Sequence, residues 1–129
     1  MNNLQKLLSL AREAAARAYC PYSHFAVGAA IESTDGKFYS GCNVENVSYP
    51  VGTCAEAGAI AAMIAGGSKK IANILIYAPS QTLITPCGAC RQRIAEFAVP
   101  ETVIYLAQTD GIDKSCTVGE LLPSSFSEF

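Results

Sequence analysis

Charge is scarce in this sequence, and its positive charge is scattered. Only 16% of the 129 residues are charged, the formal net charge is −2, and the nine Lys and Arg residues come close together only at Lys69-Lys70 and at Arg91 and Arg93. Non-specific binding of nucleic acid depends on clustered basic side chains that neutralise phosphates. The composition therefore argues against a nucleic-acid partner and favours a small, uncharged substrate.

Long hydrophobic runs are also missing. The longest uncharged apolar stretch, residues 57–67, is far shorter than the ~20 residues that a helix needs to cross a bilayer. Residues 1–13 carry charges between their leucines, unlike a signal peptide. We therefore expect no membrane partner and a cytoplasmic location, where the six cysteines stay reduced and serve metal binding or catalysis rather than disulfides.

What the sequence does contain is enough apolar material for a core. Half of the residues are apolar, and the length predicts a single domain over residues 1–129. Hydrophobic periodicity and turn signals predict an amphipathic helix over 4–18 that ends by Pro21, followed by a hairpin of strands 26–33 and 37–44. They then predict a helix over 54–65, a strand over 71–78, a helix over 87–98 and a strand over 102–107. After an Asp110-Gly111 turn we expect a short strand and a last helix that starts at the Thr117–Glu120 capping box.

This order of elements predicts an α/β fold. We expect a three-layer α-β-α sandwich on a mixed five-stranded sheet, in which an N-terminal antiparallel hairpin precedes βαβαβ-type units. The helix over 54–65 is apolar nearly all round, so we expect one side of it in the core and another against a partner subunit.

Three cysteines occur at predicted helix starts. Cys54 lies in Thr53-Cys54-Ala55-Glu56, and Cys87 and Cys90 lie in Pro86-Cys87-Gly88-Ala89-Cys90. Unpaired N–H groups at a helix start favour the thiolate, and three thiolates with an open fourth position are typical of a catalytic zinc site. A Cys-x-x-Cys pair alone could equally be a redox pair or two buried thiols, but the second cluster favours Zn²⁺.

Glu56 follows Cys54 by two residues, within the same first turn. A carboxylate there can reach a water at the open position, whose acidity zinc raises, and can move protons during a reaction. Cys-x-Glu followed by Pro-Cys-x-x-Cys is the signature of zinc-dependent deaminases in its three-cysteine form. Cys20, Cys42 and Cys116 lack such partners and are interpreted as small buried apolar residues.

The whole chain resembles the small homotetrameric cytidine deaminase family. The resemblance extends from Tyr19-Cys20-Pro21-Tyr22-Ser23 to Leu121-Leu122-Pro123, and its motifs also include residues 21–30, 41–46, 54–56 and 86–92 in this order. It implies a cytidine deaminase-like fold and the hydrolysis of cytidine and deoxycytidine to uridine and deoxyuridine plus ammonia in pyrimidine salvage. It also implies a homotetramer with shared active sites.

The resemblance assigns roles residue by residue. Cys54, Cys87 and Cys90 would bind zinc, and Glu56 would shuttle protons. The remaining positions that match the family's substrate-binding residues are Phe25 against the pyrimidine ring, Asn43 and Glu45 on the ribose hydroxyls, Val44 between them, Ala55 through its backbone, and Tyr49 and Phe126 in a neighbour's site. Asn43 and Glu45, two apart at a predicted strand end, point the same way.

The chain departs from the family at one position. Many relatives have Arg directly after the catalytic Glu, where this sequence has Ala57. Such an Arg would moderate the negative charge of three thiolates. Here either the helix N-terminal amides and Arg91 moderate this charge, or the zinc acidifies its water less.

Two alternatives from different classes stay open. One is a deaminase of a related substrate, either free cytosine, a nucleoside antibiotic or a base within a polynucleotide; Asn43-Val44-Glu45 argues against the free base. The other is a non-catalytic interaction module that zinc stabilises. The position of Glu56 next to an incomplete set of metal ligands argues against it.

Overall fold

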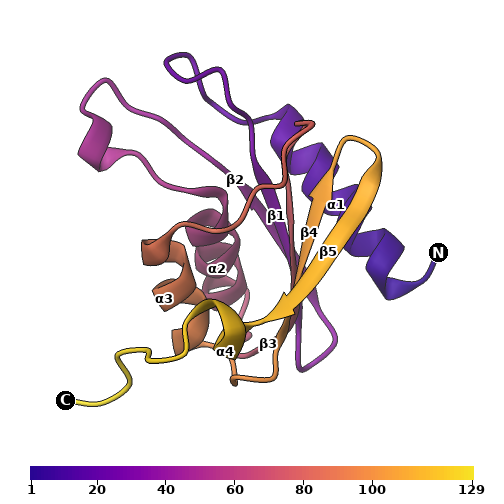
Figure 1. The fold of residues 1–129 in the computed structure, drawn as a ribbon, viewed down its shortest axis with the longest axis vertical. Coiled ribbons are helices and arrows are strands. Elements are labelled where there is room, and N and C mark those ends of the chain that lie inside the picture. Colours follow the sequence, from indigo (N-terminus) through magenta and orange to yellow (C-terminus); the bar gives the residue numbers. More distant parts are fainter.

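The structure is a computed structural model that describes all residues, 1–129. Its elements, in chain order, are α1 (Asn3–Ala16), β1 (Gly28–Ser33), β2 (Phe38–Cys42), the 3-10 helix η1 (Tyr49–Val51), α2 (Ala55–Ala65), β3 (Ile71–Tyr77), α3 (Gly88–Glu96), β4 (Val103–Gln108), β5 (Gly111–Thr117) and α4 (Val118–Leu121). Figure 1 follows this order by colour. None of the helices is long and apolar enough to cross a membrane.

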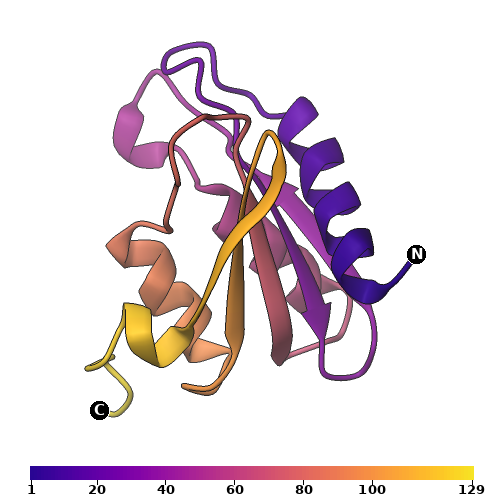
Figure 2. The ribbon, with the colours of Figure 1, turned by 45° about the vertical axis from the view of Figure 1, so that its right-hand side comes forward.

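The five strands form one mixed sheet in the order β2-β1-β3-β4-β5. The β3–β4 pair is parallel, and the other three pairs are antiparallel. Helix α1 covers one face of the sheet, and α2 and α3 cover the other, as Figure 2 shows. The predicted three-layer α-β-α sandwich on a mixed five-stranded sheet is therefore confirmed.

Each face of the sheet has its own core. On β3, Ile74 and Ile76 point toward α2 and α3, whereas Leu75 and Tyr77 point toward α1. Successive side chains of a strand alternate between faces, so a strand covered on both sides must be apolar at every position. This is why residues 74–78 form a continuous apolar run.

Two glycines allow helices to lie unusually close to the hairpin. A Cβ on Gly28 would lie 1.9 Å from the carbonyl oxygen of Ala11 in α1, and one on Gly41 would lie 2.3 Å from the backbone nitrogen of Ala59 in α2. Both contacts are with backbone atoms, which cannot rotate aside. The hairpin therefore has a helix packed directly on each side of its backbone.

Helix α1 ends earlier than its periodicity predicts. It stops at Ala16, and Tyr19 pairs with the chain beyond β2: its N–H donates to the Asn43 carbonyl at 3.1 Å, and its own carbonyl accepts from the Glu45 N–H at 2.8 Å. These long-range hydrogen bonds replace the last helical turn. They also fix the segment before β1 against the segment after β2.

Candidate active site

Helices α2 and α3 both begin at a cysteine. Cys54 and Cys87 have extended backbones, at ψ 160° and 167°, and are the N-cap residues of their helices. The sequence predicts them to be the first helical residues, so each helix begins one residue later than expected. Neither thiol caps its own helix, so both remain available for other contacts. Because α2 leads into β3 and α3 follows it, the two helix starts meet at the carboxyl end of β3.

The three cysteines of the sequence signature form one cluster. The Sγ atoms of Cys54, Cys87 and Cys90 all lie within 4.8 Å of one another. Zinc–sulfur bonds of about 2.3 Å in tetrahedral geometry place the sulfur atoms about 3.8 Å apart, so the cluster has the size of a zinc site. His24, the only histidine, is not in this group.

The surroundings of the cluster affect the pKa values of its three thiols differently. Burial raises the pKa of Cys90, which is fully buried, and also that of Cys54. In contrast, the backbone N–H of Cys90 lowers the pKa of Cys87, at the rim of the cluster. Holding all three as thiolates in such a place requires a cation between them, and this donor set fits a metal ion.

Glu56 lies in the first turn of α2 and is buried, with 4% of its surface exposed. Burial raises the pKa of its carboxyl, while its own backbone N–H and the Cys90 thiol partly offset this effect. A raised pKa brings a carboxyl closer to neutrality, where it can both accept and release a proton. Glu56 is thus a buried carboxyl beside the thiols, with a pKa raised by its burial.

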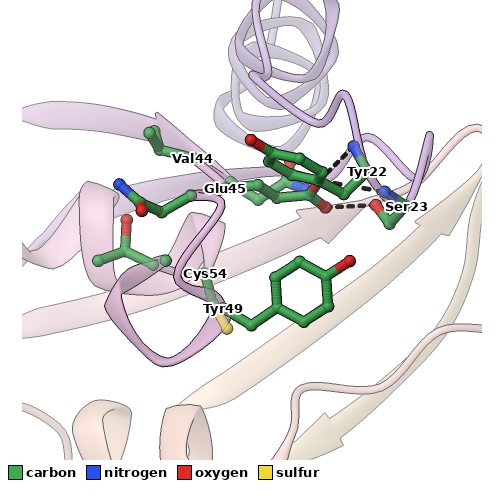
Figure 3. A pocket seen from close by; sticks show the side chains of 10 residues that line it. Tyr22, Ser23, Val44, Glu45, Tyr49 and Cys54 are labelled. Atoms are coloured by element: carbon green, nitrogen blue, oxygen red, sulfur yellow. Dashed lines mark hydrogen bonds between the residues drawn. The ribbon is translucent and has the colours of Figure 1, made fainter.

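An open pocket of about 440 Å³ ends at Cys54. Its lining residues are Tyr22, Ser23, Asn43, Val44, Glu45, Asn46, Tyr49, Gly52, Thr53 and Cys54. Figure 3 shows Glu45 on the side of the Tyr22-Ser23 turn. The rings of Tyr22 and Tyr49 lie 5.7 Å apart at 58°. The pocket therefore leads from an aromatic rim to a cysteine of the cluster.

Glu45 is held by one short turn. Its carboxylate accepts hydrogen bonds from the backbone N–H groups of Tyr22, at 3.0 Å, and Ser23, at 3.1 Å, and from the Ser23 hydroxyl (Figure 3). The hydrogen bond from the Ser23 hydroxyl is the main reason that the pKa of Glu45 lies below its usual value. A carboxylate has about four acceptor positions, so one stays free for a ligand.

Asn43 is held just as firmly. Its amide oxygen accepts from the Val27 N–H at 2.9 Å, and its amide nitrogen donates to the Phe25 carbonyl at 2.8 Å. One amide hydrogen and one lone pair stay free. Asn43 therefore fixes the segment that carries Phe25 and can still make hydrogen bonds to a ligand.

The other predicted substrate-binding residues are more dispersed. Val44 lines the pocket, Ala55 is buried at the start of α2, and Tyr49 lies at the rim, 72% exposed. Phe25 is half-exposed and does not line the pocket. Phe126 is 64% exposed on the C-terminal tail, so the structure does not bring it into the pocket of its own chain.

Two residues that hold parts of the candidate site in place, Ser23 and Gln92, were not predicted from the sequence. Ser23 connects Glu45 to the Phe25 N–H, which donates to the Ser23 hydroxyl at 3.0 Å. Gln92 holds the tail through two hydrogen bonds with the Phe126 backbone, at 2.9 and 3.1 Å. Ser23 lies within a motif that carried the resemblance, but the pairing of Gln92 with residue 126 has no local signal.

Arg91 does not have the contacts expected of it. Its guanidinium donates to the carbonyls of Pro86, at 2.8 Å, and Leu121, at 3.1 Å, and to the Thr85 hydroxyl at 3.4 Å. Arg91 thus ties the cysteine loop to α4. The guanidinium that reaches a cysteine is that of Arg93, whose Nη1 lies 3.5 Å from Cys90 Sγ.

Comparisons with known proteins agree with this geometry. Residues 1–106 match the family model of the cytidine and deoxycytidylate deaminase zinc-binding region. The chain is 39% identical over 126 residues to a cytidine deaminase of Sporosarcina psychrophila, covering 98% of this chain and 93% of that one, and 40% identical over 123 residues to one of Halalkalibacterium halodurans, covering 95% and 93%.

Solved structures show the same likeness. The crystal structure of cytidine deaminase from Burkholderia pseudomallei superposes with a TM-score of 0.90 at 39% identity, covering 98% of this chain and all of that one. The crystal structure of cytidine deaminase from Mycobacterium tuberculosis gives a TM-score of 0.85 at 36% identity, covering 99% of this chain and all of that one. With its fold, its three-cysteine cluster and its sequence in agreement, the chain belongs to the cytidine deaminase family of enzymes.

Proposed function

We propose that this protein hydrolyses cytidine and deoxycytidine to uridine and deoxyuridine, with release of ammonia, in pyrimidine salvage, and that it depends on zinc. The observation that carries the proposal is the buried Glu56 beside the cluster of Cys54, Cys87 and Cys90. A redox pair or a structural zinc site would not need a buried carboxyl with a raised pKa at this place.

The three thiols would hold the metal, and Glu56 would move the protons. A zinc ion bound there supplies Lewis acidity toward a water molecule. Glu56 would take a proton from a water as its oxygen attacks C4 of the base, and would pass this proton to N3. Glu56 would then take the proton of the new C4 hydroxyl and deliver it to the amino group, so that C4=O forms as the C–N bond breaks, one water is consumed and one ammonia leaves.

Glu45 and Asn43 would recognise the sugar. Each keeps hydrogen-bonding capacity after its contacts with the Tyr22–Val27 segment are counted, and both line the pocket. A carboxylate and an amide suit hydroxyl groups, and the fixed negative charge of Glu45 disfavours a phosphorylated sugar. Phe25 and Val44 would contact the base and sugar, and Ala55 would offer its backbone, which together favour a nucleoside over free cytosine.

Further we propose a homotetramer in which each active site is shared. Val47, Tyr49 and Val51 are 78%, 72% and 63% exposed, and α2 carries exposed Ala61 and Ile64 on its outer side. Exposed large apolar side chains so close in the chain as Val47, Tyr49 and Val51 suit a surface that another subunit covers. Tyr49, at the exposed rim of its own chain's pocket, and Phe126, outside that pocket, would complete a neighbour's site.

The reducing cytoplasm is the location that suits this site. All six cysteines are free thiols in the structure, and thiolate ligands must stay reduced to bind a metal.

The first experiment is a direct assay. The purified protein should remove the cytidine absorbance band, contain one zinc per chain, and act on cytidine and deoxycytidine within a panel that includes free cytosine and nucleoside antibiotics. Cys87→Ala should lose metal and activity together. Turnover by a verified metal-free preparation would refute the zinc mechanism, and a preference for an antibiotic would establish the related deaminase instead.

A second variant separates the enzyme from a zinc-stabilised interaction module. Glu56→Gln is nearly isosteric and should keep the metal and the melting temperature while turnover falls about 10²–10⁴-fold. If Glu56→Gln retains turnover within tenfold, Glu56 is not the proton shuttle. If the wild type binds zinc and acts on no nucleoside at all, the module is the correct interpretation.

A further inference from the structure

Arg93 is the basic residue whose guanidinium reaches the cysteine cluster. It follows Cys90 by three residues on α3, so the two side chains lie on the same side of the helix. Its Nη1 donates to Cys90 Sγ at 3.5 Å, a normal distance for a hydrogen bond to sulfur. Cys90 is fully buried, whereas Arg93 is exposed at the surface.

The cluster has a surplus of negative charge that this contact can offset. With three thiolates and Glu56 ionised, a Zn²⁺ ion would still leave two negative charges in excess, at a site where Cys90 and Glu56 are buried. Ala57 supplies no charge, and the donors of Arg91 are directed to two carbonyls and the Thr85 hydroxyl. This leaves Arg93 as the side chain that brings a positive charge to a cluster sulfur.

We propose that Arg93 is a positioning residue for the metal site, taking from α3 the place that Ala57 on α2 leaves without charge. A guanidinium that donates to a thiolate draws charge from the sulfur and stabilises the anionic site. This inference rests on the proposed zinc-dependent function. To the proposed function it adds the side chain that offsets the negative charge of the cysteine ligands.

The competing explanation is purely structural. Arg93 lies in the last turn of α3, where a positive charge interacts favourably with the helix dipole. A structural role would lower stability on substitution without changing the electronic state of the sulfur. The test must therefore report on the metal–sulfur bond itself.

Arg93→Met removes the donor and the charge at similar side-chain length. We expect it to bind zinc about 10–100-fold more weakly in competition with a chelator, the usual cost of losing a partner of a metal ligand. In the Co²⁺-substituted protein the thiolate-to-cobalt absorption should move to longer wavelength, because an unbonded sulfur gives up charge more easily. Arg93→Lys should recover part of both properties.

Arg17→Met is the matched control, since Arg17 is an exposed arginine at the end of α1 with no contact to the cluster. It should leave both readouts unchanged. If Arg93→Met binds zinc within twofold of the control and shows the same cobalt spectrum, the proposal for Arg93 is wrong while the zinc enzyme stands. If the wild type binds no zinc, the proposed function fails first and this inference fails with it.

Discussion

At the scale of single residues, the site depends on how short polar side chains fix its charged ones. Ser23 is the clearest case: its hydroxyl donates to the Glu45 carboxylate and accepts from the Phe25 N–H at 3.0 Å. One hydroxyl therefore connects the residue proposed to bind the sugar with the residue proposed to contact the base. Gly or Ala at this position would leave Glu45 with only its two backbone donors.

Ser23→Ala should raise the KM for cytidine about tenfold with little change in kcat. The variant loses a hydrogen bond to a charged group, worth roughly 1.5 kcal/mol or more. That bond orients Glu45, which would bind the sugar and not the reacting atoms, so substrate binding should weaken and the chemical step should not. Steady-state kinetics check this, with Ser9→Ala on α1 as control. A fall in kcat at constant KM would show that Ser23 acts on the chemical step instead.

At the scale of elements, the hairpin β1–β2 is the part on which both helical layers depend. Helix α2 packs on it so closely that Gly41 and the backbone of Ala59 leave no room for a Cβ. The turn of the same hairpin is tied to the end of α2 by a polar cluster: Asp35 accepts from the hydroxyls of Ser33 and Ser68, and Ser68 is 2.8 Å from the Tyr39 hydroxyl. These contacts fix α2, and with it Cys54 and Glu56, relative to the sheet.

Gly41→Ala should destabilise the protein by about 3 kcal/mol or more, because the new methyl group meets backbone atoms of α2 that cannot move independently. Gly58→Ala is the control on the helix side of the same contact. Its Cβ would lie 3.5 Å from the nearest atom, the Cys42 carbonyl oxygen, and alanine favours a helix by up to about 1 kcal/mol. Denaturant unfolding measures both, and equal stabilities would contradict the close contact.

The Asp35 cluster predicts a dependence of stability on pH. Hydrogen bonds from Ser33 and Ser68 lower the pKa of Asp35 from its usual 3.8. Since the folded-state pKa is depressed, the stabilisation is fully present above the unfolded value and is lost as pH falls through the folded one. The melting temperature of Asp35→Asn should therefore lie below wild type at pH 6, and the difference should shrink at pH below about 4. A difference that is independent of pH would show that the ionised carboxylate is not the stabilising form.

The sequence predicted these elements because each carries a local signal. Periodicity located the helices and strands, and the Thr117–Glu120 capping box is present as expected, with the Glu120 N–H donating to Thr117 at 3.2 Å. The approach of Cys54 to Cys87 and Cys90 could be anticipated because helix starts gather at strand ends. The point where α1 ends could not be predicted, because it depends on pairing with residues 43–45. The contacts of Arg91 could not be predicted either, because one of them is with Leu121, thirty residues away.

At the scale of the whole molecule, the C-terminal tail is anchored through its backbone while its aromatic rings stay exposed. Gln92 on α3 forms two hydrogen bonds with the Phe126 backbone, which fixes the tail at that point. The Phe126 ring nevertheless stays exposed, stacked edge-on only against Phe129 at 5.7 Å. The tail emerges on the side of α3 and α4, away from the N-terminus (Figure 1). An anchored backbone with an unburied aromatic ring suits delivery of that ring to another subunit.

Mixed assemblies test this sharing directly. Glu56→Gln subunits lack the proton shuttle but carry Phe126, and Phe126→Ala subunits carry Glu56 but lack the ring, so each homo-oligomer should be nearly inactive. Equal amounts, co-expressed with different tags and purified through both, should recover about one quarter of wild-type activity, because half of the subunits carry Glu56 and half of their neighbours carry Phe126. If Phe126 instead serves its own chain, no subunit of the mixture has both groups and activity stays at the level of the parents. A strictly monomeric protein in sedimentation would exclude sharing altogether, and with it the roles proposed for Tyr49 and Phe126.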